Sequence, residues 1–179
     1  MEIESLPVEG AKLITTDVFC DDRGAFEEAF DYESLSRLGV EFQPNSGCFS
    51  YNESPHTLRG MHFQKSPYAQ SKLVSCVQGR AWDVIVDLRP QSGTFGRWCG
   101  RELVAASGLS VLVPAGCAHG FMTLESGTTI AYLIQGAYRP ESGRALSWND
   151  TSIGIEWPCS DPILSAKDAA APDWNSCEF

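Results

Sequence analysis

The sequence predicts a mainly β protein with few helices, and three observations support this fold class. Short strand-like runs bounded by Gly, Pro, Asn or Asp recur along the 179 residues. Only one segment has a clear helical pattern. Many short strands with few helices are typical of sandwiches, barrels and jelly rolls. No repeat, linker or low-complexity tract divides the chain, so we expect a single domain spanning residues 1–179.

The longest β pattern is KLVSCVQGRAWDVIVDLR, residues 72–89. Two Val-rich arms flank a Gln-Gly pair at 78–79, and this arrangement predicts a hairpin. In the second arm, over residues 83–88, three apolar residues alternate with a set that contains Asp83 and Asp87. Successive side chains of a strand point to opposite faces. One face of this strand is therefore expected to be buried and the other to be mixed.

Three further stretches predict strands, and one predicts a helix. RELV at 101–104 and LSVLVP at 109–114 are expected to form a second strand pair, because a short Gly-containing turn separates them. TTIAYLIQ at 128–135 is rich in β-branched residues, which favour strands. The expected helix is DYESLSRLGV at 31–40, where Asp31 can cap the first turn.

The composition excludes some classes of protein. Thirteen Lys and Arg against 23 Asp and Glu give a net charge of −10, which argues against general nucleic-acid binding. A local Arg/Lys cluster can still attract a small anionic ligand. No signal-peptide pattern and no membrane-spanning apolar stretch is found, so a cytoplasmic location is expected. The seven cysteines include no CxxC pair and indicate free thiols in a reducing compartment.

The stretch GLSVLVPAGCAHGFMT, residues 108–123, carries the first chemical signal. The spacing from its Gly through Pro-Ala-Gly to His119 resembles the second cupin motif. The Pro-x-Gly turn would end one strand and let His119 point into a barrel from the next. The expected fold is therefore a cupin jelly-roll barrel with short flanking helices.

The stretch TLRGMHFQ, residues 57–64, lies where cupins carry their first motif. That motif usually supplies two His and a Glu as metal ligands. Here His62 is present, Gln64 takes the place of the second His, and no Glu follows at a suitable distance. Two histidines and an amide make a poor divalent site. We therefore expect a barrel that has lost its metal and needs no cofactor.

A histidine that is not a metal ligand is suited to act as a base. Imidazole titrates near physiological pH, and a carboxylate partner would fix the tautomer of His62. Lys72 could then stabilise an oxyanion, and Arg59 could bind a phosphate.

Strings spread over most of the chain resemble the dTDP-4-dehydrorhamnose 3,5-epimerases, a metal-free cupin family of nucleotide-sugar biosynthesis. The order of LRGxHxQ, AHGF and WND…IxWP is specific, whereas each string alone is weak. The matching strings are DDRGAFEEAF (21–30), TLRGMHFQ (57–64), KLVSCVQGRAWDVIVDLR (72–89), SGTFGRW (92–98), VPAGCAHGF (113–121), AYLIQGAYRPE (131–141), WNDTSIGIEWP (148–158) and PILSAKD (162–168).

The resemblance implies a cofactor-independent isomerase that converts dTDP-4-dehydro-6-deoxyglucose to dTDP-4-dehydrorhamnose. The 4-ketone of such a sugar acidifies the hydrogens at C3 and C5. A base removes one of them, an enolate forms, and an acid returns a proton to the opposite face. By resemblance His62 is the base, Asp168 is its acidic partner, Tyr132 returns the proton and Lys72 steadies the enolate oxygen.

The resemblance also implies a substrate-binding set. Arg23, Arg59 and His119 match positions that contact the diphosphate or hold the pocket. Phe26, Glu28 and Tyr138 match positions near the nucleotide or the sugar. Members of the family are usually homodimers in which N-terminal strands cross to the partner.

By the same resemblance, Arg23, Phe26 and Glu28 are expected to act on the neighbouring subunit's site. The partners expected for the chain are therefore a nucleotide-sugar substrate and a second copy of the chain, with neither nucleic acid nor membrane.

Departures from the family pattern keep other functions open. Ser46 and Cys48 stand where the family has a Gln and an Asn that help to hold the nucleotide. A C3-only or C5-only epimerase acting on a different nucleotide sugar is one alternative. A metal-dependent cupin oxygenase and a non-catalytic sugar-binding jelly roll are two others. On the residues alone, His119 could simply pack behind its turn, Lys72 could guard a sheet edge and Tyr132 could belong to the core.

Overall fold

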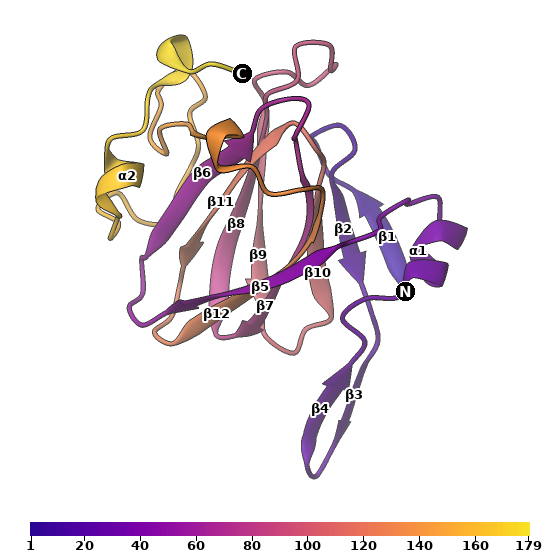
Figure 1. The fold of residues 1–179 in the computed structure, drawn as a ribbon. Helices are drawn as coiled ribbons and strands as arrows, with labels where there is room; N and C mark the ends of the chain where they lie inside the picture. Colours follow the sequence, from indigo (N-terminus) through magenta and orange to yellow (C-terminus); the bar gives the residue numbers. More distant parts are fainter.

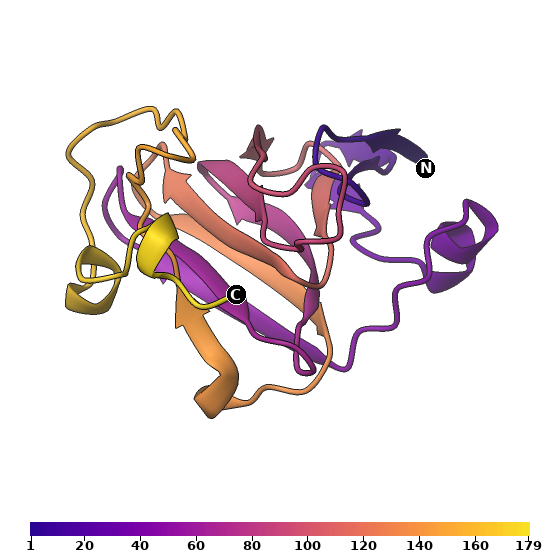
Figure 2. The same cartoon turned by 90° about the horizontal axis from the view of Figure 1, so that it is seen from above.

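The computed structural model describes residues 1–179 and confirms the mainly β fold. Two antiparallel sheets face each other and form a jelly-roll barrel, with short helices at the periphery (Figures 1 and 2). The six-stranded sheet runs, in spatial order, β1 (Glu2–Ser5), β2 (Lys12–Thr15), β10 (Leu109–Val113), β7 (Ser71–Gln78), β12 (Thr128–Gln135) and β5 (Ser46–Asn52). The five-stranded sheet runs β13 (Gly143–Ala145), β6 (Leu58–Gln64), β11 (Cys117–Thr123), β8 (Arg80–Asp87) and β9 (Trp98–Val104).

The predicted hairpin over residues 72–89 is wrong in its pairing. Strands β7 and β8 begin and end close to where the sequence predicts, but they lie in different sheets. Strand β7 pairs with β10 and β12, whereas β8 pairs with β11 and β9. Gly79 joins them with φ of +74°, a conformation that serves a corner between sheets as well as a hairpin turn. Long-range pairing therefore decides what the local turn signal leaves open.

The second predicted strand pair is wrong for the same reason. Strand β9 belongs to the five-stranded sheet and β10 to the six-stranded sheet, so residues 101–104 and 109–114 do not pair with each other. The strand predicted at 128–135 is confirmed as β12. The predicted helix is confirmed as α1 (Tyr32–Arg37), and the Asp31 carboxylate accepts the backbone N–H of Glu33 at its first turn.

The main core lies between the two sheets. It combines Val74 and Ile130 from the six-stranded sheet with Ile85 and Phe121 from the five-stranded sheet. On β8 the position of Ile85 shows which face points inward, and Asp83 shares that face because side chains alternate along a strand. The mixed face that the sequence predicts for β8 is thus the interior of the barrel.

A C-terminal segment covers the outer face of the five-stranded sheet. Val84 and Val86 of β8 pack there in a second core cluster with Leu146, under partly buried residues of the segment such as Trp157 and Trp174. Figure 1 shows this segment, in orange and yellow, running beside β6. It contains the 3-10 helices Pro140–Ser142 and Trp174–Ser176 and the helix α2 (Ala166–Ala169).

Hydrogen bonds fix the chain on both sides of α2. Before it, Ile163 exchanges backbone hydrogen bonds with His56 and Leu58 at the start of β6. After it, the buried Asp150 carboxylate accepts the backbone N–H of Trp174 at 2.7 Å. The segment is therefore tied to the same strand that carries the LRGMHFQ sequence.

A two-stranded hairpin projects from the barrel. Strands β3 (Val18–Asp21) and β4 (Gly24–Glu27) pair only with each other and extend away from both sheets (Figure 1). Phe19 and Phe26 on this hairpin are 65% and 70% exposed. None of the helices has the length and apolar character needed to cross a membrane.

Candidate active site

A cavity of about 320 Å³ opens beside β6, and its charged lining is mostly basic. Its four cationic side chains and one carboxylate are unusual in a chain of net charge −10. Such a concentration of positive charge in a concave site favours an anionic ligand. The charged residues and the histidine that line the cavity are Arg59, His62, Lys72, Arg144, Lys167 and Asp168.

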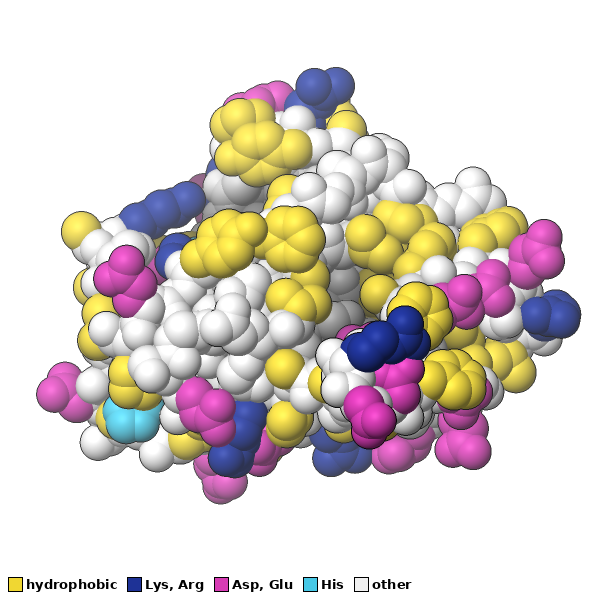
Figure 3. Space-filling model, turned by 90° about the horizontal axis from the view of Figure 1, so that it is seen from below, with side chains coloured by type: hydrophobic (Ala, Val, Ile, Leu, Met, Phe, Trp, Pro, Cys, Tyr) yellow, Lys and Arg dark blue, Asp and Glu magenta, His cyan; other side chains and the backbone are white.

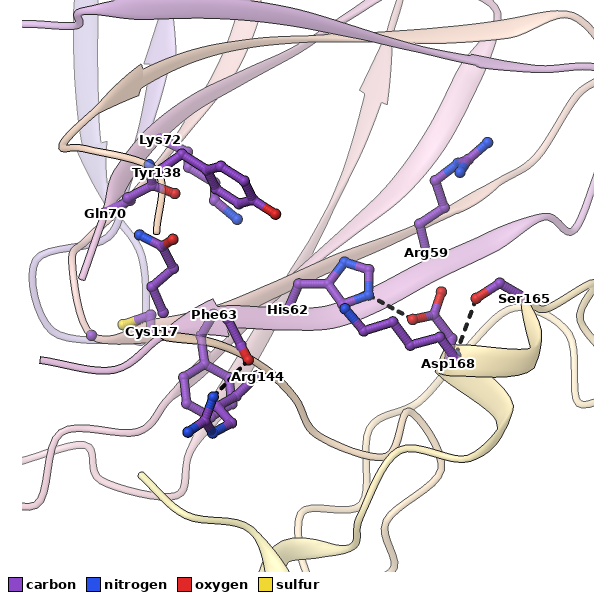
Figure 4. A pocket seen from close by; sticks show the side chains of 14 residues that line it. Arg59, His62, Phe63, Gln70, Lys72, Cys117, Tyr138, Arg144, Ser165 and Asp168 are labelled. Atoms are coloured by element: carbon purple, nitrogen blue, oxygen red, sulfur yellow. Dashed lines mark hydrogen bonds and ion pairs between the residues drawn. The ribbon is translucent and has the colours of Figure 1, made fainter. Parts of the chain in front are cut away.

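His62 and Asp168 form a hydrogen-bonded pair in this cavity. His62 Nε2 lies 2.6 Å from Asp168 Oδ1, although the residues belong to β6 and α2 (Figure 4). Asp168 is 4% exposed, and the Ser165 hydroxyl that caps α2 accepts its backbone N–H. Because a carboxylate accepts hydrogen bonds, Nε2 carries the proton and Nδ1 keeps the basic lone pair.

Burial lowers the pKa of His62 below its ordinary value, although Asp168 opposes this effect. The positive charges of Lys72 and Lys167 lower the pKa of His62 further. The imidazole is therefore neutral at physiological pH. Since the His62 side chain is 40% exposed, this neutral base remains accessible from the cavity.

Lys72 lines the cavity from the facing sheet. Its strand, β7, lies inside the six-stranded sheet, so the alternative of an edge lysine that guards against aggregation is wrong. Burial lowers the pKa of Lys72 to about 8, and the charge of Asp83 acts in the opposite direction. At neutral pH the side chain remains an ammonium, which suits it to stabilise a developing oxyanion.

Tyr132 and His119 lie deeper in the barrel. Their rings meet edge-on with centroids 5.9 Å apart. His119 is 3% exposed, and its Nε2 lies 2.7 Å from Oδ2 of the buried Asp83. Burial raises the pKa of Tyr132 far above that of a free tyrosine, so its phenol stays protonated across the physiological range.

Gln64 is engaged in holding the backbone. Its amide donates to the carbonyls of Tyr68 and Ala137 and accepts the N–H of Arg139. His62 and His119, the other two positions of the cupin metal motif, each bind a carboxylate instead. The donor set at the cupin metal position therefore does not fit a divalent cation.

The family model of dTDP-4-dehydrorhamnose 3,5-epimerase matches residues 5–176. The chain belongs to this family. A curated dTDP-4-dehydrorhamnose 3,5-epimerase from Sinorhizobium fredii is 43% identical, over 100% of this chain and 91% of the relative. Members of the family are isomerases acting on a nucleotide sugar, so this chain is an enzyme of that class.

Two solved structures of epimerases extend the comparison. The Bacillus anthracis dTDP-4-dehydrorhamnose 3,5-epimerase with TDP and PPi bound matches with a TM-score of 0.92 and 41% identity, over 96% of this chain and 98% of that one. A 3'-monoepimerase from Streptomyces bikiniensis, in complex with dTDP-quinovose, matches with a TM-score of 0.86 and 33% identity, over 94% and 85%. A 3,5-epimerase and a 3'-monoepimerase thus share the fold of this chain.

The structure brings most of the predicted site residues of this epimerase-family chain together. Arg59, His62, Lys72, Tyr138 and Asp168 line the cavity, whereas Tyr132 and His119 contact each other in the barrel and are not part of its lining. Arg59 is oriented by Asn52, whose side-chain oxygen accepts its Nε–H at 2.8 Å. Tyr138 is 70% exposed and lines the cavity together with Lys72.

Arg23, Phe26 and Glu28 lie outside this chain's own cavity. Arg23 and Phe26 belong to the projecting hairpin, and Glu28 follows it directly. Arg23 forms an exposed ion pair with Asp21 at the tip. Figure 3, which views the molecule from below, shows exposed hydrophobic side chains on the face toward which the hairpin extends. Their predicted action on a partner's site stays a prediction.

Sequence reasoning missed three charged residues of this region. Lys167 and Arg144 line the cavity, and Asp83 binds His119 beneath it. Lys167 could have been found from its position next to Asp168. Asp83 could have been found from an acidic residue at an inward position of a strand. Arg144 carried no recognisable signal.

Proposed function

We propose that this chain inverts C3 and C5 of dTDP-4-dehydro-6-deoxyglucose by proton transfer through an enolate, giving dTDP-4-dehydrorhamnose. The observation that carries the proposal is the His62–Asp168 pair, a neutral base held in one tautomer, in the same cavity as the Lys72 ammonium. The 4-ketone of the substrate serves as the electron sink, so the reaction itself requires no cofactor.

In the first step His62 Nδ1 takes a proton from a carbon next to the ketone. The electron pair of the broken C–H bond moves to the ketone oxygen, which becomes the enolate oxygen. Asp168 stabilises the imidazolium that forms, as the carboxylate partner of a catalytic histidine does. Lys72 donates to the enolate oxygen, where negative charge develops.

In the second step Tyr132 returns a proton to the opposite face of the carbon. Its raised pKa keeps the phenol protonated until the enolate forms. The enolate electrons form the new C–H bond, and the ketone is restored. At the second carbon the same residues repeat both steps after proton exchange with solvent.

The basic lining of the cavity suits the diphosphate of the substrate. Arg59 and Lys167 line the same cavity as His62. Planar guanidinium groups bind phosphate oxygens in bidentate fashion, and ammonium groups bind them as point charges. We propose that these groups hold the diphosphate while the sugar lies between His62 and Tyr132, with His119 shaping the floor of the pocket.

We also propose that the whole chain, residues 1–179, forms one epimerase domain and acts as a homodimer. The exposed Phe19 and Phe26 would be covered by a second copy, and Arg23 and Glu28 would then reach the neighbouring site. Mixing inactive His62→Ala with inactive Arg23→Ala protein tests this. Activity regained in mixed dimers supports action across the interface, and no recovery in confirmed mixed dimers contradicts it.

A second candidate function, inversion of one carbon only or action on another nucleotide sugar, is favoured by one observation. Cys48 lies directly opposite Tyr132 in the pairing of β5 with β12. By resemblance, a Gln and an Asn are expected where this chain has Ser46 and Cys48. A changed neighbour beside the proposed proton donor could alter which carbon is reprotonated from the opposite face.

The stereochemistry of the product tests these functions. Purified protein is incubated with dTDP-4-dehydro-6-deoxyglucose, the ketone is reduced with borohydride, and proton couplings assign C3 and C5. Inversion at both carbons supports the leading proposal, and inversion at one supports the second candidate. Retention at both, with a His62→Ala control that gives the same products, would contradict both.

A further inference from the structure

Gln64 is a buried amide that forms hydrogen bonds to the backbone of two other segments. It lies at the end of β6 and is 7% exposed. Its Nε2 donates to the carbonyl of Tyr68 at 2.6 Å and to the carbonyl of Ala137 at 3.0 Å. Its Oε1 accepts the backbone N–H of Arg139 at 2.7 Å. One side chain therefore joins β6 to the turn after it and to the segment that follows β12.

The chemistry of these three bonds requires a side-chain amide. The NH2 group of glutamine supplies two donors and its oxygen supplies an acceptor, which match two carbonyls and one N–H. A neutral histidine, which cupins usually carry at this position, has one donor and one acceptor, and an ionised carboxylate has no donor. The residue that replaces the metal ligand is thus suited to holding these two segments.

Tyr138 lies between the two Gln64 contacts of the segment after β12. Since Ala137 and Arg139 are both bound to Gln64, the backbone is fixed on either side of Tyr138. The Tyr138 side chain lines the cavity and is 70% exposed, so packing against the protein holds little of its ring (Figure 4). The position of the ring therefore depends on how the backbone beneath it is held.

Further contacts join the same two segments, but the residues that make them are partly exposed. The Gln70 amide donates to the carbonyl of Gly136 at 3.1 Å. A Cβ at Gly136, which has φ of +114°, would lie 3.2 Å from Cγ of Gln70. The Arg139 guanidinium lies 5.5 Å from the centroid of the Tyr68 ring, in cation–π geometry. Gln64 is the buried residue of this group, so its hydrogen bonds are the ones shielded from competition with water.

We propose that Gln64 is a positioning residue for nucleotide binding, which fixes the backbone around Tyr138 so that the Tyr138 ring forms a wall for the base of the substrate. This inference rests on the proposed function. The base of a nucleotide is a flat π system, and an exposed aromatic ring offers it a face on which to stack. Because the Gln64 amide is engaged with the backbone, it acts on the substrate through Tyr138. The His62–Asp168 pair does not involve this segment, so proton transfer is expected to survive its loosening.

The first test measures the binding of dTDP by calorimetry to Gln64→Met, to Tyr138→Ala and to the double variant. Methionine is close to glutamine in length and removes all three hydrogen bonds. Gln64→Met and Tyr138→Ala are each expected to weaken binding about tenfold, within the range for the loss of one stacked base. The double variant should bind dTDP about as weakly as Tyr138→Ala alone, because Gln64 acts through Tyr138.

Thr128→Val is the matched control. The Thr128 hydroxyl is also buried and bound to backbone carbonyls, those of Arg80 and Glu125, but at the other end of β12. This variant should bind dTDP as the wild type does, even if it is less stable. With substrate, Gln64→Met should raise KM about tenfold and keep kcat within about twofold, whereas Thr128→Val should change neither.

Hydrogen exchange tests the attachment of the segment without any ligand. The backbone N–H of Arg139 is bound to Gln64, so its exchange should be about tenfold faster or more in Gln64→Met than in the wild type or in Thr128→Val. If Gln64→Met does not fold, Gln64→Asn carries the same expectations, because its amide is one methylene shorter and does not reach all three backbone groups.

Equal dTDP affinity of the wild type and folded Gln64→Met, or a wild type that binds no dTDP, would overturn the inference. An unchanged exchange rate at Arg139 would also overturn it, and so would a full additional loss of affinity in the Tyr138→Ala background. A fall in kcat at constant KM would contradict it by placing Gln64 in the chemistry instead. Because dTDP carries no ketone, a chain that epimerises no sugar can still show the coupled loss of binding. Failure of the proposed function is thus distinguishable from failure of this inference.

Discussion

His62 Nε2 lies 2.6 Å from Asp168 Oδ1 across a separation of 106 residues, and this contact depends on how the C-terminal segment is anchored. Ile163 ties the segment to the beginning of β6, and Asp150 holds Trp174 after α2. The imidazole on β6 and its carboxylate partner on the short helix α2 are therefore brought together by contacts that fix the chain before and after α2.

Asp168→Asn is expected to lower kcat about 100-fold or more with only a small effect on stability. An amide can donate to Nε2 and so favour the wrong tautomer, in which Nδ1 carries the proton and is no longer basic. Steady-state kinetics measure the loss. Asp173→Asn, at an exposed helix cap nearby, is the control and should retain activity. Equal kinetics for the two variants would contradict the role of Asp168.

Tyr132→Phe is expected to separate proton removal from inversion. The variant keeps the His62 base, so solvent hydrogen should still exchange into the sugar, while the inverted product falls about 100-fold or more. Proton NMR in heavy water follows both quantities. Loss of exchange and inversion to the same extent would show that Tyr132 is not specific to the second step.

The rate is expected to follow a bell-shaped dependence on pH. On the acid side His62 must be neutral, and its pKa lies below the ordinary value of about 6.5, so activity is lost only as the pH falls below that range. On the alkaline side Lys72 must be protonated, and activity is lost as the pH rises through about 8. The residual activity of Lys72→Met should lack the alkaline limb. An alkaline limb that persists in this variant would contradict the assignment.

Asp87→Asn is expected to destabilise the fold by about 3 kcal/mol, as removal of one partner from a buried ion pair does. Burial by itself would raise the pKa of Asp87, but hydrogen bonds from Arg89, Ser92 and Thr94 lower it well below its usual range. The stability that this carboxylate contributes is therefore present above the unfolded pKa of about 3.9 and is lost as the pH falls.

Urea unfolding at several pH values tests this account of Asp87. The wild type should lose stability between about pH 4 and pH 2, while Asp87→Asn should lose less over the same range. Parallel curves for the two proteins would contradict the prediction.

The strands were predictable from sequence, but their partners were not. Residues 128–135 are a strand because β-branched residues fill it, and that information is local. The corner at Gly79 looks the same whether the chain pairs with itself or crosses to the facing sheet, so β7 and β8 were wrongly paired. Only long-range packing distinguishes the two outcomes.

The candidate site was predicted mainly through resemblance. The neighbouring sequence allowed His62 to be interpreted as a free base, because Gln64 replaces the second histidine of the cupin metal motif. Asp168 could not be paired with it by spacing, since the loops that return α2 to β6 leave no periodic signal. Asp83 was missed because its contact with His119 depends on the pairing of β8 with β11, and that is a property of the folded barrel.

The most direct test of the central claim is deuterium incorporation into dTDP-4-dehydro-6-deoxyglucose in heavy water, comparing the wild type with His62→Ala. If His62 is the base of an epimerase, deuterium enters C3 and C5 with the wild type and enters neither carbon with the folded variant. Exchange at the same rate in both proteins, or at neither carbon in the wild type, would contradict the account.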